Sequence, residues 1–246
     1  MRSLLRRSIR PVAARLYRSH PIKNWPKWVG DVLEVNAPAS LPGKPSLSPE
    51  GGANINIILD LLGRTRNLPG DVAECGVFKG SSLCAIALYL RENGIAKHVF
   101  GLDSFQGFDQ SVRKDIELGG KANTEKRLGG FDGTSISHVR RKLTRLGLVD
   151  AVTLIPGYFA ETLRTLPAMS FSFVHLDCDI YDSYKQTLNF FYSKMSNGGI
   201  ILLDEYEDPP WPGCKLAVDE YLADKLEKPT AIMMDNYQKY FLEKLA

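Results

Sequence analysis

Two apolar segments of this chain end abruptly in carboxylates, and this feature constrains the fold more than any other. Residues 173–183 read FVHLDCDIYDS, and residues 198–208 read GGIILLDEYED. Each has the continuous apolar run expected of a strand that is buried on both faces of a parallel sheet. The carboxyl ends of parallel strands meet at one edge of the sheet, where α/β proteins bind their ligands. We therefore expect the carboxylates after the two strands to converge on one crevice.

These converging carboxylates predict a metal site. Asp177 and Asp179 follow the first strand, and Asp204 and Glu205 follow the second. Carboxylates brought this close repel one another unless a cation lies between them. Oxygen ligands favour a hard divalent ion, so we expect Mg2+ or a similar cation, with positions left over for a substrate.

A second signature lies upstream at residues 70–82, which read GDVAECGVFKGSS. It predicts a short strand followed by a helix from Ser81 to about Arg91. Glycines at such a turn let the backbone approach a ligand closely, and the helix N-terminus offers free N–H groups. The spacing E-x-G-x-x-x-G differs from the G-x-G-x-x-G of dinucleotide enzymes. An acidic Glu74 at the end of this strand suits the cationic amino acid tail of S-adenosylmethionine.

The next predicted strand, HVFGLDSF at residues 98–105, ends in Asp103. A carboxylate at this point is placed to accept hydrogen bonds from both ribose hydroxyls of an adenosine. A third strand ends at Gly157 and Tyr158, which we expect near the adenine. The residues expected to bind S-adenosylmethionine are Glu74, Gly76, Gly80, Ser81, Ser82, Asp103, Ser104, Phe105, Gly157, Tyr158 and Asp177.

Six motifs occur in order along residues 52–246: ECGVFKGSS, GLDSFQGF, IPGYFAETL, HLDCDIYDS, LLDEYED and PGCKLAVDEY. Together they resemble the macrocin O-methyltransferase family, metal-dependent S-adenosylmethionine enzymes that methylate sugar hydroxyls of bacterial natural products. The resemblance implies that Asp177, Asp204 and Glu205 are the metal ligands. It also implies that Asp179 is the general base, so that Asp179 and Asp177 are the catalytic residues. Glu205 stands where the family usually has an aspartate, which keeps the charge but lengthens one ligand arm.

The order of the predicted elements favours an α/β fold. Strands and helices alternate until the last two strands, TAIMMD and KYFLEKL, which should pair as a hairpin. With the resemblance, this order predicts a Rossmann-like seven-stranded methyltransferase sheet, mostly parallel with the last strand antiparallel, and with helices on both faces. We place this domain at residues 51–246. The polar, glycine-containing stretch at about residues 109–133 is expected to be a lid over the acceptor.

The first 50 residues are expected to form an N-terminal extension. The first 20 contain six arginines and no acidic residue, although the formal net charge of the whole chain is only +3. This arm fits a helical extension that supports a dimer or covers the site, a transit peptide, or a helix on a membrane surface. No aromatic platform or known motif supports nucleic-acid binding. Residues 21–50 are proline-rich and predict an extended connector, with Trp25 and Trp28 docked on the domain.

The composition bears on location and assembly. No apolar run approaches the ~20 residues of a membrane span, and the four cysteines form no C-x-x-C pair. This cysteine pattern fits free thiols in a reducing compartment. We therefore expect a cytoplasmic protein. The family resemblance implies a small hydroxylated acceptor, and we also expect a homo-oligomer.

The predicted function is metal-dependent O-methylation of a sugar or other vicinal diol in a small-molecule natural product. A catechol presents the same pair of oxygens, so a catechol-type enzyme stays open. An NAD-dependent oxidoreductase would share the first strand and Asp103 but would show the tighter glycine spacing and need no second acidic cluster. A non-catalytic adenosine-binding module would tolerate the loss of those acids, which are intact here.

Overall fold

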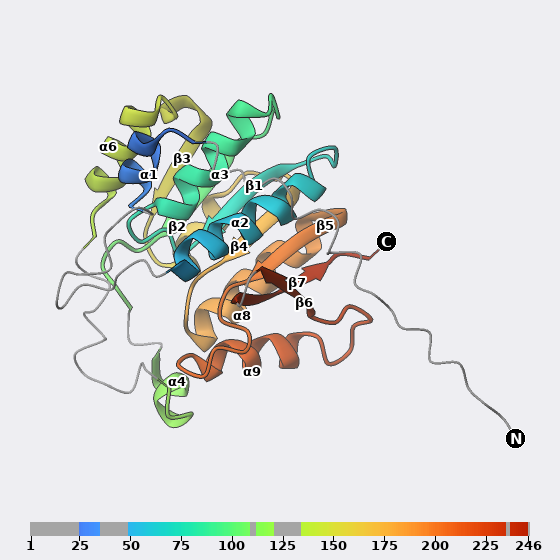
Figure 1. Cartoon of the computed structure of the whole chain (residues 1–246). Coiled ribbons are helices and arrows are strands. Elements are labelled where there is room, and N and C mark those ends of the chain that lie inside the picture. Colours follow the sequence, from blue (N-terminus) through green and yellow to red (C-terminus); the bar gives the residue numbers. More distant parts are fainter. Residues whose placement is uncertain (1–24, 35–48, 109–111, 121–133, 235–236, 246) are drawn as a thin grey trace, which may run out of the picture.

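A computed structural model describes residues 25–34, 49–108, 112–120, 134–234 and 237–245 of the 246-residue chain. Its centre is a seven-stranded sheet with the strand order β3-β2-β1-β4-β5-β7-β6 (Figure 1). The strands are β1 (Asp71–Cys75), β2 (Val99–Asp103), β3 (Val152–Pro156), β4 (Phe171–Leu176), β5 (Met195–Leu203), β6 (Thr230–Met234) and β7 (Tyr237–Glu243). Strands β1 to β5 pair in parallel, whereas β7 runs antiparallel to both β5 and β6. The predicted fold class is confirmed.

Helices cover both faces of this sheet (Figure 1). One face, here called the α3 face, packs against α1 (Lys27–Leu33), α2 (Pro49–Arg64), α3 (Ser81–Glu92) and α6 (Ile136–Leu146). The other, the α8 face, packs against α7 (Phe159–Thr162), α8 (Tyr181–Phe191) and α9 (Pro212–Tyr221). Val72 joins the core of the α3 face and Ala73 that of the α8 face, because successive side chains of a strand point to opposite sides. Both faces are apolar, which is why the strands read as continuous apolar runs.

Helix α1 corrects the prediction of an extended connector over residues 21–50. Three of its residues are buried in the core of the α3 face, namely Val29, Val32 and Leu33. Their i, i+3, i+4 spacing is that of an amphipathic helix, and it outweighs the neighbouring prolines. Trp25 docks as predicted, since its indole Nε1 donates a hydrogen bond to Glu92 at 2.7 Å. The predicted docking of Trp28 is wrong, because this side chain is 51% exposed.

The described part of the predicted lid is not a continuous loop. Residues 113–117 form helix α4 (Arg113–Glu117), which contacts α8 and α9. Residues 109–111 and 121–133 of this stretch, and the basic arm at residues 1–20, lie outside the described residues. Among the helices described, none has both the length and the apolar character needed to cross a membrane. The four cysteines are free and buried, in agreement with the predicted free thiols.

Candidate active site

A cleft opens at the carboxyl ends of β1, β2, β3 and β4. Its lining contains seven of the residues predicted for the site: Gly76, Asp103, Ser104, Gly157, Tyr158, Asp177 and Asp179. The predicted cofactor residues Glu74, Gly80, Ser81, Ser82 and Phe105 do not line it. Gly80 instead precedes α3 as its N-cap, with a φ of 77° and no room for a side chain beside Val139. Phe105 packs against the core of the α3 face.

Nine further residues of the cleft lining were not predicted: Phe78, Gly107, Phe108, Phe159, Ala160, Cys178, Ile180, Ser183 and Gln186. All but Gln186 lie inside the motifs quoted above, and three of them, Phe159, Cys178 and Ile180, directly adjoin a predicted site residue. Their position in a loop that directly follows a strand could therefore have identified these residues as part of the cleft. Ser183 and Gln186 lie on α8, and they reach the cleft only because this helix packs beside it.

Gly76 is required by the close approach of β1 and β4. Its φ is 92°, a left-handed conformation that favours glycine. A Cβ atom at this position would overlap the backbone oxygen of Asp177. The N–H of Asp177 in turn donates to the carbonyl of Cys75 at 2.9 Å. The glycine turn and the first acidic residue are therefore parts of one tightly packed corner.

Asp103 organises the same corner. Its carboxylate accepts hydrogen bonds from the N–H groups of Val77 at 2.7 Å, Phe78 at 2.8 Å and Phe105 at 2.6 Å. Phe78 and Phe105 have φ values of 47° and 53°, a conformation that costs a non-glycine residue about 1–2 kcal/mol. Since a carboxylate has about four lone-pair sites, Asp103 has about one left. The remaining site is open to a ribose hydroxyl, and the contact of Asp103 with the ribose stays a prediction.

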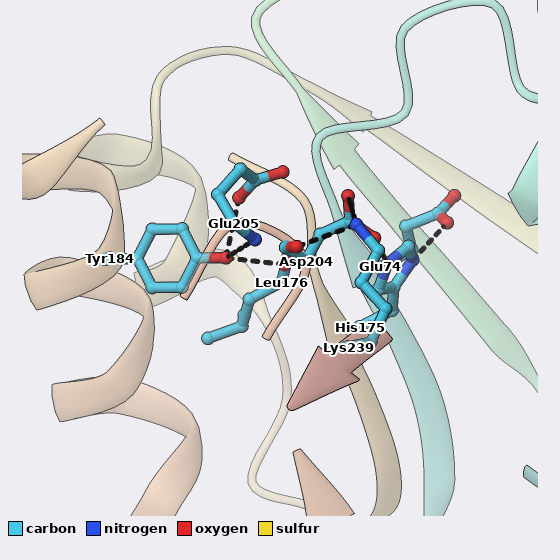
Figure 2. A network of polar contacts seen from close by, with 7 residues as sticks. All are labelled: Glu74, His175, Leu176, Tyr184, Asp204, Glu205 and Lys239. Atoms are coloured by element: carbon cyan, nitrogen blue, oxygen red, sulfur yellow. Dashed lines mark hydrogen bonds and ion pairs between the residues drawn. The ribbon is translucent and has the colours of Figure 1, made fainter. Parts of the chain in front are cut away.

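A row of four charged side chains crosses four neighbouring strands beside the cleft (Figure 2). Glu74 of β1 binds His175 of β4, with 2.8 Å between Oε1 and Nδ1. The Nε2 atom of His175 lies 3.3 Å from Oδ1 of Asp204, which follows β5. Lys239 of β7 donates to Oδ2 of Asp204 at 2.5 Å and to its backbone oxygen at 2.7 Å. Strand alternation directs all four side chains toward the α3 face.

Their mutual contacts decide their charges. Burial disfavours a charged imidazole, but the hydrogen bonds to Asp204 and Glu74 outweigh this and raise the pKa of His175 to about 10. Burial alone would raise the pKa of Asp204, yet the charges of Lys239 and His175 hold it well below its ordinary value. The pKa of Lys239 is raised because the charge of Asp204 outweighs the effect of burial. The second oxygen of Glu74, Oε2, is buried and has no hydrogen-bond partner among the residues that the structure describes, which leaves one acceptor for the predicted contact with the amino group of the cofactor.

The predicted acidic cluster extends beyond the cleft, since Asp177 and Asp179 line it but Asp204 and Glu205 do not. Ligand atoms of His175, Asp177 and Asp204 lie within 4.8 Å of one another. Glu205 follows Asp204 in the turn after β5, and its carboxylate is hydrogen-bonded to that of Asp177. Its Oε2 accepts a hydrogen bond from Tyr184 of α8 at 2.7 Å (Figure 2).

The pKa values of these acids reflect the crowding. Burial, and then the charge of Asp204, raise the pKa of Asp177 to about 6. Burial and the charge of Asp177 raise the pKa of both Asp179 and Glu205 well above their ordinary values. A cation among these groups would remove the repulsion. The carboxylates of Asp177 and Asp204 therefore fit a hard divalent cation, whereas His175 does not fit as a ligand because both its nitrogens donate to carboxylates.

The seven-stranded sheet with a reversed strand β7, and with a cleft at its carboxyl edge, defines a Rossmann-like methyltransferase fold. The chain belongs to the macrocin-O-methyltransferase (TylF) family, whose sequence profile matches residues 58–243. Demethyldecarbamoylnovobiocin O-methyltransferase of Streptomyces niveus is 35% identical over 166 residues, which are 67% of this chain and 62% of that protein. Mycinamicin III 3''-O-methyltransferase of Micromonospora griseorubida is 32% identical over 63% of this chain and 61% of that protein. The matches thus span about three-fifths of these curated relatives.

Solved structures agree with this family. The O-methyltransferase NovP superposes with a TM-score of 0.68 and 30% identity, covering 78% of this chain and 80% of that chain. The calicheamicin methyltransferase CalS11 superposes with a TM-score of 0.63 over 88% of this chain and 90% of that chain. At 21% identity, the second likeness shows the fold alone.

Proposed function

We propose that this chain is an S-adenosylmethionine-dependent O-methyltransferase that methylates a hydroxyl of a sugar or other vicinal diol in a small-molecule natural product. The observation that carries the proposal is one cleft whose lining brings the glycine turn and Asp103 together with Asp177 and Asp179. This arrangement fits a nucleoside cofactor next to an acidic acceptor site. The names of the relatives support the acceptor class, since they are O-methyltransferases of demethyldecarbamoylnovobiocin and of mycinamicin III.

The proposed roles follow the geometry of the cleft. Gly76 and Asp103 would hold the ribose side of the cofactor, and Gly157 and Tyr158 the adenine side. Asp177 and Asp204 would hold a divalent cation, and Glu205, whose carboxylate is hydrogen-bonded to that of Asp177, would complete the ligand set. When bound, such a cation lowers the pKa of a hydroxyl of the acceptor and fixes its position.

Asp179 is proposed as the general base. It lines the cleft two residues after Asp177, and its φ of 59° lies in the left-handed region. Residues held in this conformation cluster at active sites, where the backbone turn directs a side chain. Asp179 would take the proton of the acceptor hydroxyl as the oxygen–methyl bond forms. The sulfur–methyl bond breaks in the same step and leaves neutral S-adenosylhomocysteine, so charge and atoms balance.

Cofactor binding is tested first. S-adenosylmethionine at about 100 times its Kd should stabilise the fold by ~2.7 kcal/mol, and NAD should not stabilise it. Stabilisation by NAD alone would overturn the proposal in favour of an oxidoreductase.

Turnover is tested next, by a mass-spectrometric screen for a mass gain of one methylene across glycosides and catechols, with and without EDTA. We expect a glycoside product that requires a divalent cation. Asp177→Asn should abolish transfer and leave S-adenosylmethionine affinity nearly unchanged. Asp179→Asn should lower kcat by roughly 100-fold to 10,000-fold, as expected for the loss of a general base. Asp224→Asn, at an exposed position, is the control. Full transfer in the chelated enzyme would remove the cation from the mechanism.

A further inference from the structure

Asp115 is a fully buried carboxylate outside the catalytic cluster. It belongs to the short helix α4, yet both its oxygens accept the backbone N–H of Tyr181, at 3.2 Å and 3.1 Å. Tyr181 is the first residue of α8, and no side chain within α8 caps this N–H. The first turn of a helix leaves its N–H groups without partners inside the helix. Asp115 therefore caps α8 from 66 residues away in the chain.

The same carboxylate also touches α9. Gly213 is the second residue of α9, and a Cβ atom on it would overlap Oδ1 of Asp115. The end of the α4 segment, here residues 112–120, is equally close to this helix. A Cβ atom on Gly120 would lie 2.7 Å from Cδ of Pro212 and 2.9 Å from the oxygen of Pro210. The α4 segment is thus fitted across the beginnings of two helices.

A small apolar cluster links this segment to the cleft. Val112, Ile180 and Trp211 are buried together, with Phe108 packed against them. The rings of Phe108 and Trp211 meet edge to face, with 5.8 Å between centroids. Phe108 and Ile180 are also part of the cleft lining. The position of the α4 segment therefore determines where two apolar residues of the cleft lie.

We propose that Asp115 is a positioning residue, which latches the α4 segment across the first turns of α8 and α9 and so holds Phe108 and Ile180 against the bound cofactor. The identity of that cofactor rests on the proposed function, whereas the latch itself rests only on the contacts above. Loss of the latch should speed dissociation of the cofactor, because two apolar walls of the cleft would no longer be fixed.

The latch should respond to pH. Burial raises the pKa of Asp115 from 3.8 to about 6, and the opposing hydrogen bond from Tyr181 does not offset it. The pKa of Asp115 is higher when the α4 segment is docked than its ordinary value. Docking of this segment is therefore strongest below about pH 4 and weakens as the pH rises through 6. This rise in the pKa of Asp115 corresponds to at most a roughly 100-fold change in the docking equilibrium.

The charged groups around Asp115 are consistent with the raised pKa of its carboxyl group. On α8, Asp182 adds a repulsive charge. On α9, Glu220 is bound to the hydroxyl of Tyr181 and to Lys185. On α4 itself, Arg113 and Lys114 pair with Glu117.

Hydrogen exchange at the Tyr181 amide tests the latch directly. The experiment measures protection factors from pH 5 to pH 8 for the native chain and three variants. These factors are corrected for the intrinsic pH dependence of exchange. In the native chain, protection should fall as pH rises through 6. Asp115→Ala should lower it about tenfold or more at pH 5, as expected for a lost buried hydrogen bond. Asp115→Asn keeps an acceptor oxygen without a charge, so it should restore protection and abolish the pH dependence. Glu117→Gln, on the exposed side of α4, should match the native chain.

Cofactor release is the second readout. Dissociation of S-adenosylmethionine, chased with S-adenosylhomocysteine, should be about tenfold faster in Asp115→Ala and close to native in Asp115→Asn. If Asp115→Ala does not fold, Gly213→Ala serves instead, because alanine favours helices but its Cβ would displace Asp115.

Native-like hydrogen-exchange protection and cofactor release in Asp115→Ala, or an Asp115→Asn profile with the native pH dependence, would overturn the latch. If the native chain binds no S-adenosylmethionine, the proposed function fails, whereas the Tyr181 amide still decides the latch.

Discussion

Replacing Lys239 by methionine tests how the charged row beside the cleft is held together. Lys239 is 6% exposed and donates to both the carboxylate and the backbone oxygen of Asp204. Methionine fills a similar volume, so packing changes little. The change leaves the buried Asp204 carboxylate with His175 as its remaining cation. Removing one partner of a buried ion pair costs about 3–5 kcal/mol, so we expect Lys239→Met to destabilise the fold by that amount.

Urea denaturation measures this loss of unfolding free energy. The control is Lys228→Met, because Lys228 is exposed and such surface changes stay within about 0.5 kcal/mol. A double-mutant cycle with Asp204→Asn isolates the pair: the double variant should lose less than the sum of the single variants, since it leaves neither charge uncompensated. A loss below about 1 kcal/mol for Lys239→Met, or strict additivity in the cycle, would refute the reasoning.

Three further outcomes are expected. Gly76→Ala should cost more than about 4 kcal/mol in unfolding free energy, since an overlap with backbone cannot relax cheaply; Gly94→Ala, with a φ of 62° and open space, should cost only about 1–2 kcal/mol, and equal losses would contradict the steric argument. Asp103→Asn should weaken S-adenosylmethionine binding about 10-fold to 100-fold by calorimetry, because hydrogen bonds to a charged acceptor are worth about 1.5–3 kcal/mol; unchanged affinity would sink this role. The hydroxyl of Tyr192 and its other partners lower the pKa of Glu227 to about 2, so this carboxylate stabilises the fold above about pH 4.5 and the effect is lost as pH falls toward 2. Glu227→Gln should flatten the stability curve in that window in acid-denaturation measurements, and an unaltered slope would refute the assignment.

The overall architecture and the edge of the sheet that binds ligands could be predicted from the sequence. Apolar runs bounded by glycines and acids specify strands, and the alternation with amphipathic helices specifies a parallel sheet. The rule that ligands bind at the carboxyl ends of such strands then located Gly76, Asp103, Asp177 and Asp179. Each of these residues is recognisable from its neighbours in the chain, and the structure places all four in one cleft.

The partners of the buried charges could not be predicted in the same way. His175 binds Glu74 across 101 residues of sequence, and Lys239 binds Asp204 across 35. These pairs depend on which strands are neighbours and on their register, and one residue of slip would turn every side chain to the opposite face.

Asp115 shows the same division between local pattern and tertiary packing. The sequence around it is polar and contains glycines, which indicates a loop. Only the docking of α4 against α8 and α9 makes its carboxylate a buried cap. Local sequence therefore determined the elements and the carboxylates at their ends, because these depend on periodicity and turn chemistry. The tertiary structure alone decided which charges meet, because that depends on contacts between segments distant in the chain.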